Sequence, residues 1–155
     1  MGEILKKRLK QKKFENREAE AFLNILVTAN LLRLKIDNVC SKFGITGTQF
    51  NVLRILKGVY PEGYPRREII CRMIEPAPDV TRLIDRLIKE GLVERYFSSE
   101  DRRLSLARIT KKGIKTLEKA KPNIDDLFKL ISKNLTAPEV KQLSDLLEKI
   151  YAPFI

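Results

Sequence analysis

The chain is short and strongly basic. Its 155 residues include 31 Lys and Arg, 20 Asp and Glu and no His, which gives a formal net charge of +11. A chain of this length suits one domain that buries about 68–70% of the surface its unfolded form exposes. It contains no run of about 18 apolar residues, and its N-terminus is charged where a signal peptide is apolar. We therefore expect a soluble, cytoplasmic protein.

The two cysteines match none of the common cysteine motifs. Cys40 and Cys71 lie 31 positions apart in a chain without histidine, so zinc-finger spacing and a CxxC motif are both absent. We predict two buried, reduced thiols and no metal site. The sequence also has neither a glycine-rich phosphate loop nor a paired-carboxylate site. We expect no cofactor and no enzymatic activity.

The positive charge is concentrated in two blocks. Residues 1–17 hold seven basic and two acidic side chains, and residues 65–112 hold twelve basic and eight acidic ones. The remaining segments are nearly balanced. This asymmetry favours a polyanionic partner, although charge alone leaves nucleic acid and a membrane surface both open.

The first half of the chain has a helical pattern. Apolar residues at three- and four-residue steps predict a long helix that ends near Gly44. Its stripe comprises Phe22, Ile25, Ala29, Leu32, Ile36, Val39 and Phe43. Thr46 or Thr48 can cap a second helix that stops at Gly58, and residues 60–63 are typical of a turn. A short third helix follows Pro65. Its apolar side comprises Ile69, Ile70, Met73 and Ile74.

Residues 78–110 combine an amphipathic helix, a glycine stop and two strands. The helix is expected over residues 78–90, and its core face comprises Val80, Leu83, Ile84, Leu87 and Ile88. Gly91 can adopt the left-handed conformation that closes a helix. Residues 92–97 and 104–109 predict strands that pair as a hairpin, joined by the polar loop 98–103. This order of parts builds a winged helix-turn-helix, which grips duplex DNA.

The C-terminal third is again helical. Thr110 can cap a helix that Pro122 should kink or divide, and the segment from Thr136 to Glu139 fits a capping box before a last amphipathic helix. The apolar positions of these helices include Ile114, Leu117, Ala120, Ile124, Leu127, Phe128, Ile131, Val140, Leu143, Leu146, Leu147 and Ile150. No repeat or flexible linker interrupts them, so we expect one continuous unit.

These motifs resemble the MarR (multiple antibiotic resistance regulator) family of bacterial and archaeal transcription factors. The resemblance rests on DVTRLIDRL at 79–87, GLVER at 91–95, DRR at 101–103 and ITKKG at 109–113. It implies a mainly α fold with a small β-hairpin, in which a winged helix-turn-helix is flanked by N- and C-terminal dimerisation helices. The dimerisation helices would span 17–44 and 113–155, the DNA-binding region 46–112, and a basic tail 1–16.

The resemblance assigns residues 78–89 to the recognition helix, which enters a major groove. Arg82 and Arg86 can pair bidentately with guanine, and Thr81 can bond a base edge or touch a thymine methyl. Alternatively, each arginine meets only phosphate or a helical partner such as Asp85 or Glu90. The other DNA-binding candidates on this helix are Pro78, Asp79, Asp85 and Lys89.

The sequence departs from the family pattern at a few positions. Asp79 stands where many relatives have Ser or Thr; it either accepts from a cytosine amino group or caps the helix, and we favour the cap. Pro76 and Pro78 bracket the beginning of the same helix. Ala107 and Ile109 replace the commoner bulky aliphatic residue and leucine of the second wing strand, which alters packing more than mechanism.

On the wing, Arg103 is expected to enter the minor groove, held in position by Asp101, and Arg102 to meet phosphate. A simpler reading is that Asp101 and Arg103 only pair with each other and stiffen the hairpin. Weaker candidates for contacts with the DNA backbone, each with a solvated-surface alternative, are Arg66, Arg67, Ser98 and Ser99.

Two features remain open at this stage. The basic tail between Lys6 and Lys13 could extend onto DNA, assist dimerisation or be disordered, and its charge favours disorder. The family resemblance also implies a small hydrophobic or phenolic effector between the dimer helices and the winged module. The residues expected there, which equally suit an ordinary core, are Phe22, Leu26, Phe43, Phe50 and Arg54.

We therefore predict a sequence-specific DNA-binding transcriptional regulator, a repressor that acts as a homodimer without a membrane partner. Its operator would be pseudo-palindromic, with half-sites about 10–10.5 base pairs apart from centre to centre. The alternative is a winged-helix module that assembles with other proteins and binds no specific DNA.

Overall fold

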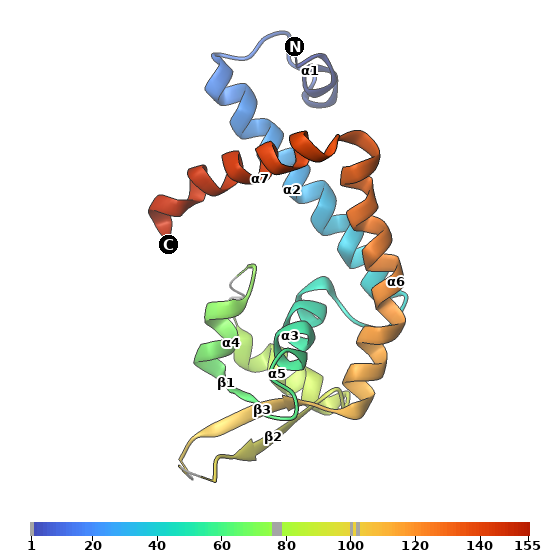
Figure 1. Ribbon diagram of the computed structural model, residues 1–155, viewed down its shortest axis with the longest axis vertical. Helices are drawn as coiled ribbons and strands as arrows, with labels where there is room; N and C mark the ends of the chain where they lie inside the picture. The colour runs from blue at the N-terminus through green and yellow to red at the C-terminus, as the bar shows by residue number, and fades with distance from the viewer. Residues whose placement is uncertain (1, 76–78, 100, 102) are drawn as a thin grey trace.

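The computed structural model describes residues 2–75, 79–99, 101 and 103–155, which form a winged module at one end and a group of helices at the other (Figure 1). The elements in chain order are α1 Glu3–Leu9, α2 Arg17–Ser41, α3 Gly47–Lys57, β1 Tyr64–Pro65, α4 Arg66–Arg72, α5 Val80–Lys89, β2 Val93–Phe97, β3 Ser105–Ile109, α6 Lys111–Asn134, α7 Ala137–Tyr151 and the 3-10 helix η1 Ala152–Phe154. The expected fold class, mainly helical with a small sheet, is confirmed.

The helix ends follow the signals in the sequence. Thr46, and not Thr48, caps α3 in a capping box: its hydroxyl accepts from the backbone N–H of Gln49 at 3.1 Å, and the Gln49 side chain accepts from the backbone N–H of Thr46 at 2.9 Å. Gly91 follows α5 with φ +71°, where a side chain would be strained. Pro122 was expected to kink or divide its helix; α6 is not divided there, and the kink stays a prediction.

The sheet has the order β1-β3-β2, and both pairings are antiparallel. Arg95 of β2 and Tyr64 of β1 lie opposite Ala107 on the two sides of β3. The short strand β1 was not predicted, because two residues are too few to show an alternating pattern. It ties the start of α4 to the wing.

The hydrophobic core lies within the winged module and surrounds α3. Its fully buried large side chains are Val52, Leu53, Leu56, Ile69, Leu87, Val93 and Ile109. They come from α3, α4, α5 and the sheet, and α6 adds Leu117 and Ile124. Burial of each such side chain contributes about 1.5–3 kcal/mol. The core therefore holds α5 and the wing on one packed unit.

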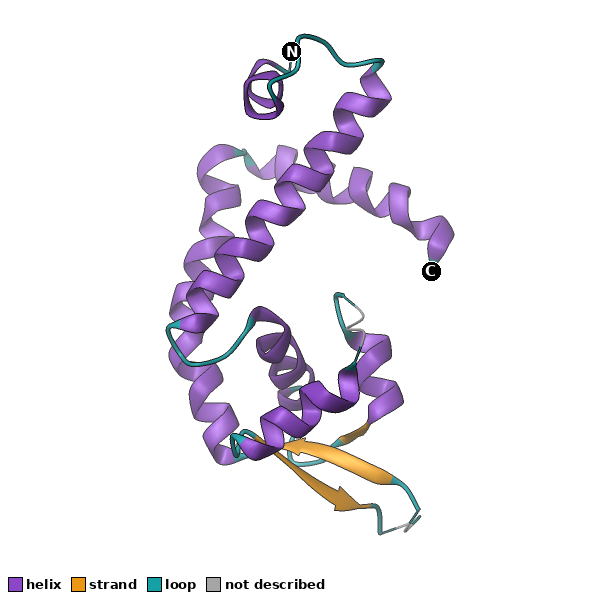
Figure 2. Ribbon diagram, turned by 180° about the vertical axis from the view of Figure 1, so that it is seen from behind, coloured by secondary structure: helices purple, strands orange, loops and turns teal. Residues whose placement is uncertain are grey.

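The opposite end of the molecule leaves much apolar surface uncovered. Phe22 is 61% and Leu26 is 50% exposed, so the expectation that they belong to the core is wrong for these two. The 15-residue helix α7 contains no buried residue. Figures 1 and 2 place α7 and the N-terminal half of α2 away from the wing.

The N-terminal segment is partly helical, which corrects the expected disorder. α1 carries an ion pair of 2.9 Å between Lys6 and Glu3, and its Leu5 is buried. Both views place α1 at the end of the molecule opposite the sheet (Figures 1 and 2). Within one chain, this helix therefore lies far from α5.

Candidate nucleic-acid interface

The recognition helix α5 is amphipathic along its whole length. Val80, Ile84 and Leu87 are buried against the core, whereas Arg82, Arg86 and Lys89 are exposed on the outer face. The helix begins at Val80; Pro78, which was expected to belong to it, lies outside the described residues. The outer face thus presents cations on successive turns.

Asp79 caps α5 and also holds the first arginine. One carboxylate oxygen accepts from the backbone N–H of Arg82 at 3.0 Å, and the other lies 2.9 Å from the Nε atom of the same residue. A carboxylate at this position also favours the positive end of the helix dipole. Arg82 nevertheless stays 88% exposed, so its guanidinium remains accessible to a partner.

Two further side chains of α5 are tied to the scaffold. The guanidinium of Arg66, the first residue of α4, donates to the Thr81 hydroxyl at 2.7 Å. Arg95 of β2 donates to the Asp85 carboxylate at 2.8 Å. Thr81 is half-buried. Asp85 pairs with a strand residue and not with an arginine of its own helix.

The wing is the loop between β2 and β3. Asp101 was expected to hold the Arg103 side chain, but its carboxylate accepts from the backbone N–H of Arg103 at 2.9 Å. The carbonyl of Asp101 accepts from Leu104 at 2.9 Å, and the Ser98 hydroxyl accepts from the N–H of Asp101 at 3.4 Å. These bonds connect the described residues Ser98, Asp101, Arg103 and Leu104, and the Arg103 side chain is exposed. Arg102 lies outside the described residues.

The remaining backbone candidates differ in accessibility. Arg67 and Ser99 are exposed, and Ser98 is half-buried.

The outer face of the sheet carries a set of contacts that was not predicted from the sequence. Arg108 donates a hydrogen bond to Glu94 at 2.7 Å, and its guanidinium stacks 4.6 Å from the centre of the Tyr96 ring. The hydrogen bond from Arg108 to Glu94 raises the pKa of the guanidinium above its ordinary value. In the register of β2 and β3, Glu94 lies directly opposite Arg108, and this pairing of opposite charges is the signal that could have predicted the contact.

A pocket lies between α2 and α3, but its lining differs from the expected one. It has a volume of about 320 Å³ and is lined by Ala29, Leu32, Arg33, Ile36, Asp37, Gly47, Thr48, Asn51, Ile74 and Glu75. None of the five expected residues, Phe22, Leu26, Phe43, Phe50 and Arg54, belongs to this lining. Phe43 and Phe50 pack against the core instead, and the other three are exposed.

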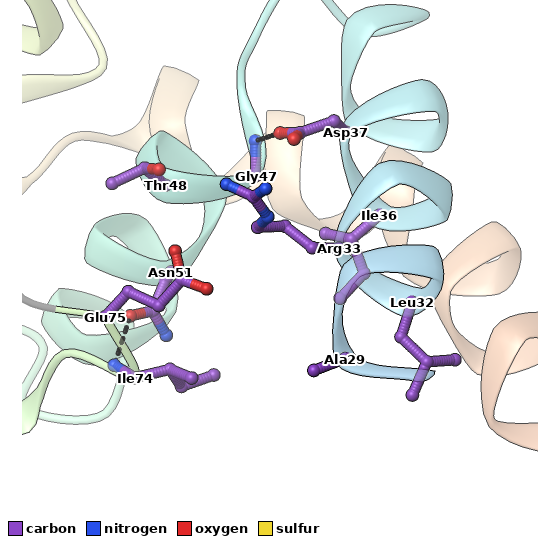
Figure 3. Close-up of a pocket in the computed structure, with 10 residues that line it drawn as sticks. All are labelled: Ala29, Leu32, Arg33, Ile36, Asp37, Gly47, Thr48, Asn51, Ile74 and Glu75. Carbon is purple, nitrogen blue, oxygen red and sulfur yellow. Dashed lines mark hydrogen bonds between the residues drawn. The ribbon is translucent and has the colours of Figure 1, made fainter. Parts of the chain in front are cut away.

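One polar group in this pocket has no partner. Asn51 is 8% exposed; its carbonyl oxygen accepts from the backbone N–H of Ile74 at 3.1 Å, and its amide nitrogen is unpaired among the described residues (Figure 3). The side chain of Arg33 extends from α2 toward α3 (Figure 3). Ile74 was expected on the apolar side of α4, but this helix ends at Arg72 and Ile74 is exposed. A buried N–H is costly without an acceptor, which water or a bound molecule can supply.

The cysteines occupy different environments. Cys40 is fully buried, and burial, with a smaller effect of the nearby Asp37 charge, raises the pKa of its thiol to about 11. Cys71 is exposed, which contradicts its expected burial, because it lies on the outer side of the short helix α4. Within the described parts of the chain, no group of three His, Cys, Asp or Glu side chains is arranged to hold a metal ion. None of the described helices could span a bilayer.

The comparisons with known proteins agree with this architecture. The family model described as "MarR family" matches residues 45–105. The multiple antibiotic resistance protein MarR of Salmonella typhimurium is 34% identical over 120 residues, which cover 74% of this chain and 79% of that protein. The chain belongs to the MarR family. Relatives of the chain include the HTH-type transcriptional repressor IacR of Pseudomonas putida.

Further proteins resemble the chain at similar levels. The regulator MhqR of Bacillus subtilis is 30% identical over 114 residues, which cover 70% of this chain and 74% of that protein. The crystal structure of a mutant MarR from Escherichia coli complexed with operator DNA superposes with a TM-score of 0.77 at 27% identity, and the match covers 90% of this chain and 99% of that one.

Proposed function

We propose that this chain is a transcriptional repressor that binds a pseudo-palindromic operator as a homodimer. The proposal rests above all on the exposed row of Arg82, Arg86 and Lys89 on α5, a helix whose opposite face is anchored in the core. The major groove of DNA is about 12 Å wide and admits such a helix. The hairpin of β2 and β3 projects beyond α5 (Figure 2). Its exposed Arg103 suits the narrow minor groove.

The uncovered apolar surface supports the homodimer. An isolated 15-residue helix is marginally stable in water, so the stability of α7 requires that its apolar side be covered. The exposed apolar side chains of α2, α6 and α7 include Phe22, Leu26, Leu34, Phe128, Leu143, Leu146 and Ile150. A second copy would cover them in a two-fold interface and would leave both α5 helices free. Two-fold symmetry then demands two half-sites.

The test combines selection of duplexes from a random pool with sedimentation equilibrium of the free protein. We expect a dimer that enriches an inverted repeat, with half-sites about one helical turn apart. Ile150→Asp should produce a monomer that binds the enriched duplex much more weakly, whereas Lys149→Ala on the same helix should bind as the wild type does. A stable protein that enriches no duplex, and captures a protein partner instead, would support an assembly module.

A second proposal concerns an effector. The pocket between α2 and α3 combines apolar walls from Leu32 and Ile36 with the Arg33 side chain and the unpaired Asn51 amide. This combination suits a small hydrophobic or phenolic molecule that carries a hydrogen-bond acceptor. Because Asn51 also holds Ile74, shortly before α5, an occupant could shift the recognition helix.

Titration with simple phenols and aromatic carboxylates tests the effector proposal. A ligand of this pocket should release DNA from the wild type, and Asn51→Leu should lower its affinity by about tenfold, the cost of one lost hydrogen bond of roughly 1.4 kcal/mol. Arg54→Ala, at an exposed position of α3 outside the pocket lining, serves as the control. Equal ligand affinity in the Asn51 variant would contradict this assignment.

A further inference from the structure

A second hollow lies on the side of the sheet that faces α5. It has a volume of about 250 Å³ and is lined by Arg66, Thr81, Ile84, Arg95, Ser105 and Ala107. These residues come from four elements: α4, α5, β2 and β3. The hollow therefore lies where the recognition helix, the start of α4 and the wing meet.

The strand register explains why this hollow is polar. Val93, Arg95 and Phe97 share one face of β2, and their partners Ile109, Ala107 and Ser105 share the same face of β3. Val93 and Ile109, the pair farthest from the wing loop, are buried, whereas Arg95 is exposed and Ser105 is half-buried. The face beneath α5 thus changes from apolar to polar toward the wing.

Ala107 keeps the hollow open. It is buried and lies directly opposite Arg95 in the ladder. Ala107 stands where the family pattern has a bulkier aliphatic residue more often. A side chain with three or four carbon atoms at this position would occupy the space between Arg95 and Thr81 that Ala107 leaves free.

The polar groups around the hollow retain unused donors. Arg66 uses one N–H on the oxygen of Thr81, so the hydroxyl proton of Thr81 is still available to an acceptor. Arg95 uses one terminal nitrogen on Asp85 and keeps its other N–H groups. Two guanidiniums and one carboxylate leave one net positive charge. This charge and donor set match a single phosphodiester.

We propose that this hollow holds one phosphate of the DNA backbone in each half-site, bound by Arg66 and Arg95 together. Thr81 and Ser105 contribute hydroxyl groups to the same phosphate. Asp85 is then a positioning residue: it orients Arg95 and reads no base. The proposal rests on the proposed DNA-binding function and specifies the contact that fixes the register of α5 relative to the duplex.

The test is a scan of the selected duplex with single methylphosphonates, each of which removes one backbone charge. For the wild type, we expect one position per half-site at which the neutral group lowers affinity strongly. For Arg95→Ala and for Arg66→Ala, this position should no longer matter. Arg108→Ala, on the opposite face of the same sheet, should retain the wild-type pattern because Arg108 is paired with Glu94.

The salt dependence provides a second readout. Each single variant should reduce the slope of log K against log salt by about 0.9 per half-site. The double variant should reduce it no further, because both arginines hold the same phosphate. Asp85→Asn should lower affinity less than Arg95→Ala without a change in base preference. Ala107→Leu, checked for folding by its melting temperature, should abolish the effect of the same methylphosphonate.

Several results would overturn the proposal. If the double variant loses twice the slope of a single one, the two arginines bind different phosphates. If the wild type binds a specific duplex but no methylphosphonate position depends on Arg95, the hollow holds no backbone phosphate. If inorganic phosphate competes with DNA at constant ionic strength, and no methylphosphonate position depends on Arg95, the hollow binds a free anion and not the DNA backbone. If the protein binds no duplex at all, the proposed DNA-binding function itself is contradicted.

Discussion

The side-chain amide of Gln49 donates a hydrogen bond of 3.2 Å to the carboxylate of Glu90, and so joins the first turn of α3 to the C-terminal cap of α5. Gln49 is 3% exposed. The backbone carbonyl of Glu90 also accepts from the Lys112 ammonium at 2.6 Å. The end of the recognition helix is thus held from two sides, by α3 and by α6.

The Gln49 contact can be removed without loss of the helix cap. Gln49→Glu retains a side chain that completes the capping box with Thr46 but places a second carboxylate against Glu90. We expect the free energy of unfolding, measured with urea, to fall by about 1–3 kcal/mol. The double variant with Glu90→Gln should recover most of this loss. If Gln49→Glu is as stable as the wild type, the contact contributes nothing.

Arg86 and Arg82 should differ in what they contribute to DNA binding. The Arg82 side chain is held by Asp79, whereas the Arg86 side chain has no hydrogen bond or ion pair to another described residue and is free to reach a base. We expect Arg86→Ala to relax the preference at one position per half-site, a discrimination of about 1–3 kcal/mol. A repeat of the duplex selection with this variant measures the change in base preference. A uniform loss of affinity on all sequences would identify Arg86 as a phosphate contact instead.

The wing should contribute affinity through Arg103. Because Asp101 bonds the backbone of Arg103 and not its guanidinium, the charge is free to enter the minor groove. We expect Arg103→Ala to weaken operator binding by about tenfold or more, the loss of one charge-assisted hydrogen bond. Lys7→Ala, in the distant helix α1, is the control. Unchanged affinity of the Arg103 variant on every sequence would rule out this role.

The two thiols should react at very different rates in the folded protein. Exposed Cys71 should react with a disulfide reagent at pH 8, whereas Cys40 should react only after unfolding, because it is buried and burial raises the pKa of its thiol to about 11. Cys71→Ser should therefore remove the fast phase. A fast phase that persists in this variant would show that Cys40 is accessible.

The same pKa shift makes stability depend on pH at the alkaline end. A thiol whose pKa is raised from 9.0 to about 11 by folding keeps its proton longer in the native state. Its contribution to stability is fully present below pH 9 and is lost as pH rises toward 11. The difference in unfolding free energy between the wild type and Cys40→Ala should therefore shrink over this interval. A difference that stays constant would contradict the shifted pKa.

Most of the fold was predictable because its signals are local. The caps at Thr46, Asp79 and Thr110 act within three residues, and the left-handed glycine at 91 acts on a single turn. Hydrophobic periodicity likewise depends only on neighbours along one helix. The strand β1 escaped prediction because its two residues are stabilised by a partner more than 40 positions away, at Leu106 and Ala107.

The candidate interface was only partly predictable. The outward row of α5 follows from its helical period, whereas the partners of Thr81 and Asp85 come from α4 and β2. The residues of the pocket between α2 and α3 depend on the crossing of two helices and on the end of α4. The exposure of Cys71 and Phe22 depends on what packs against each helix, which a single periodic stripe does not reveal.

The sequence by itself determined the order of the longer helices and of the two wing strands, the helix caps, the cationic face of α5 and the family, because these depend on residues close together in the chain. The tertiary structure alone decided that Arg66 and Arg95 flank one hollow beneath α5, and that Asn51 lies in the other pocket with an unpaired amide. The physical reason is that these groups meet across separate elements. Their distances are set by how the core packs, and no local pattern in the chain encodes that packing.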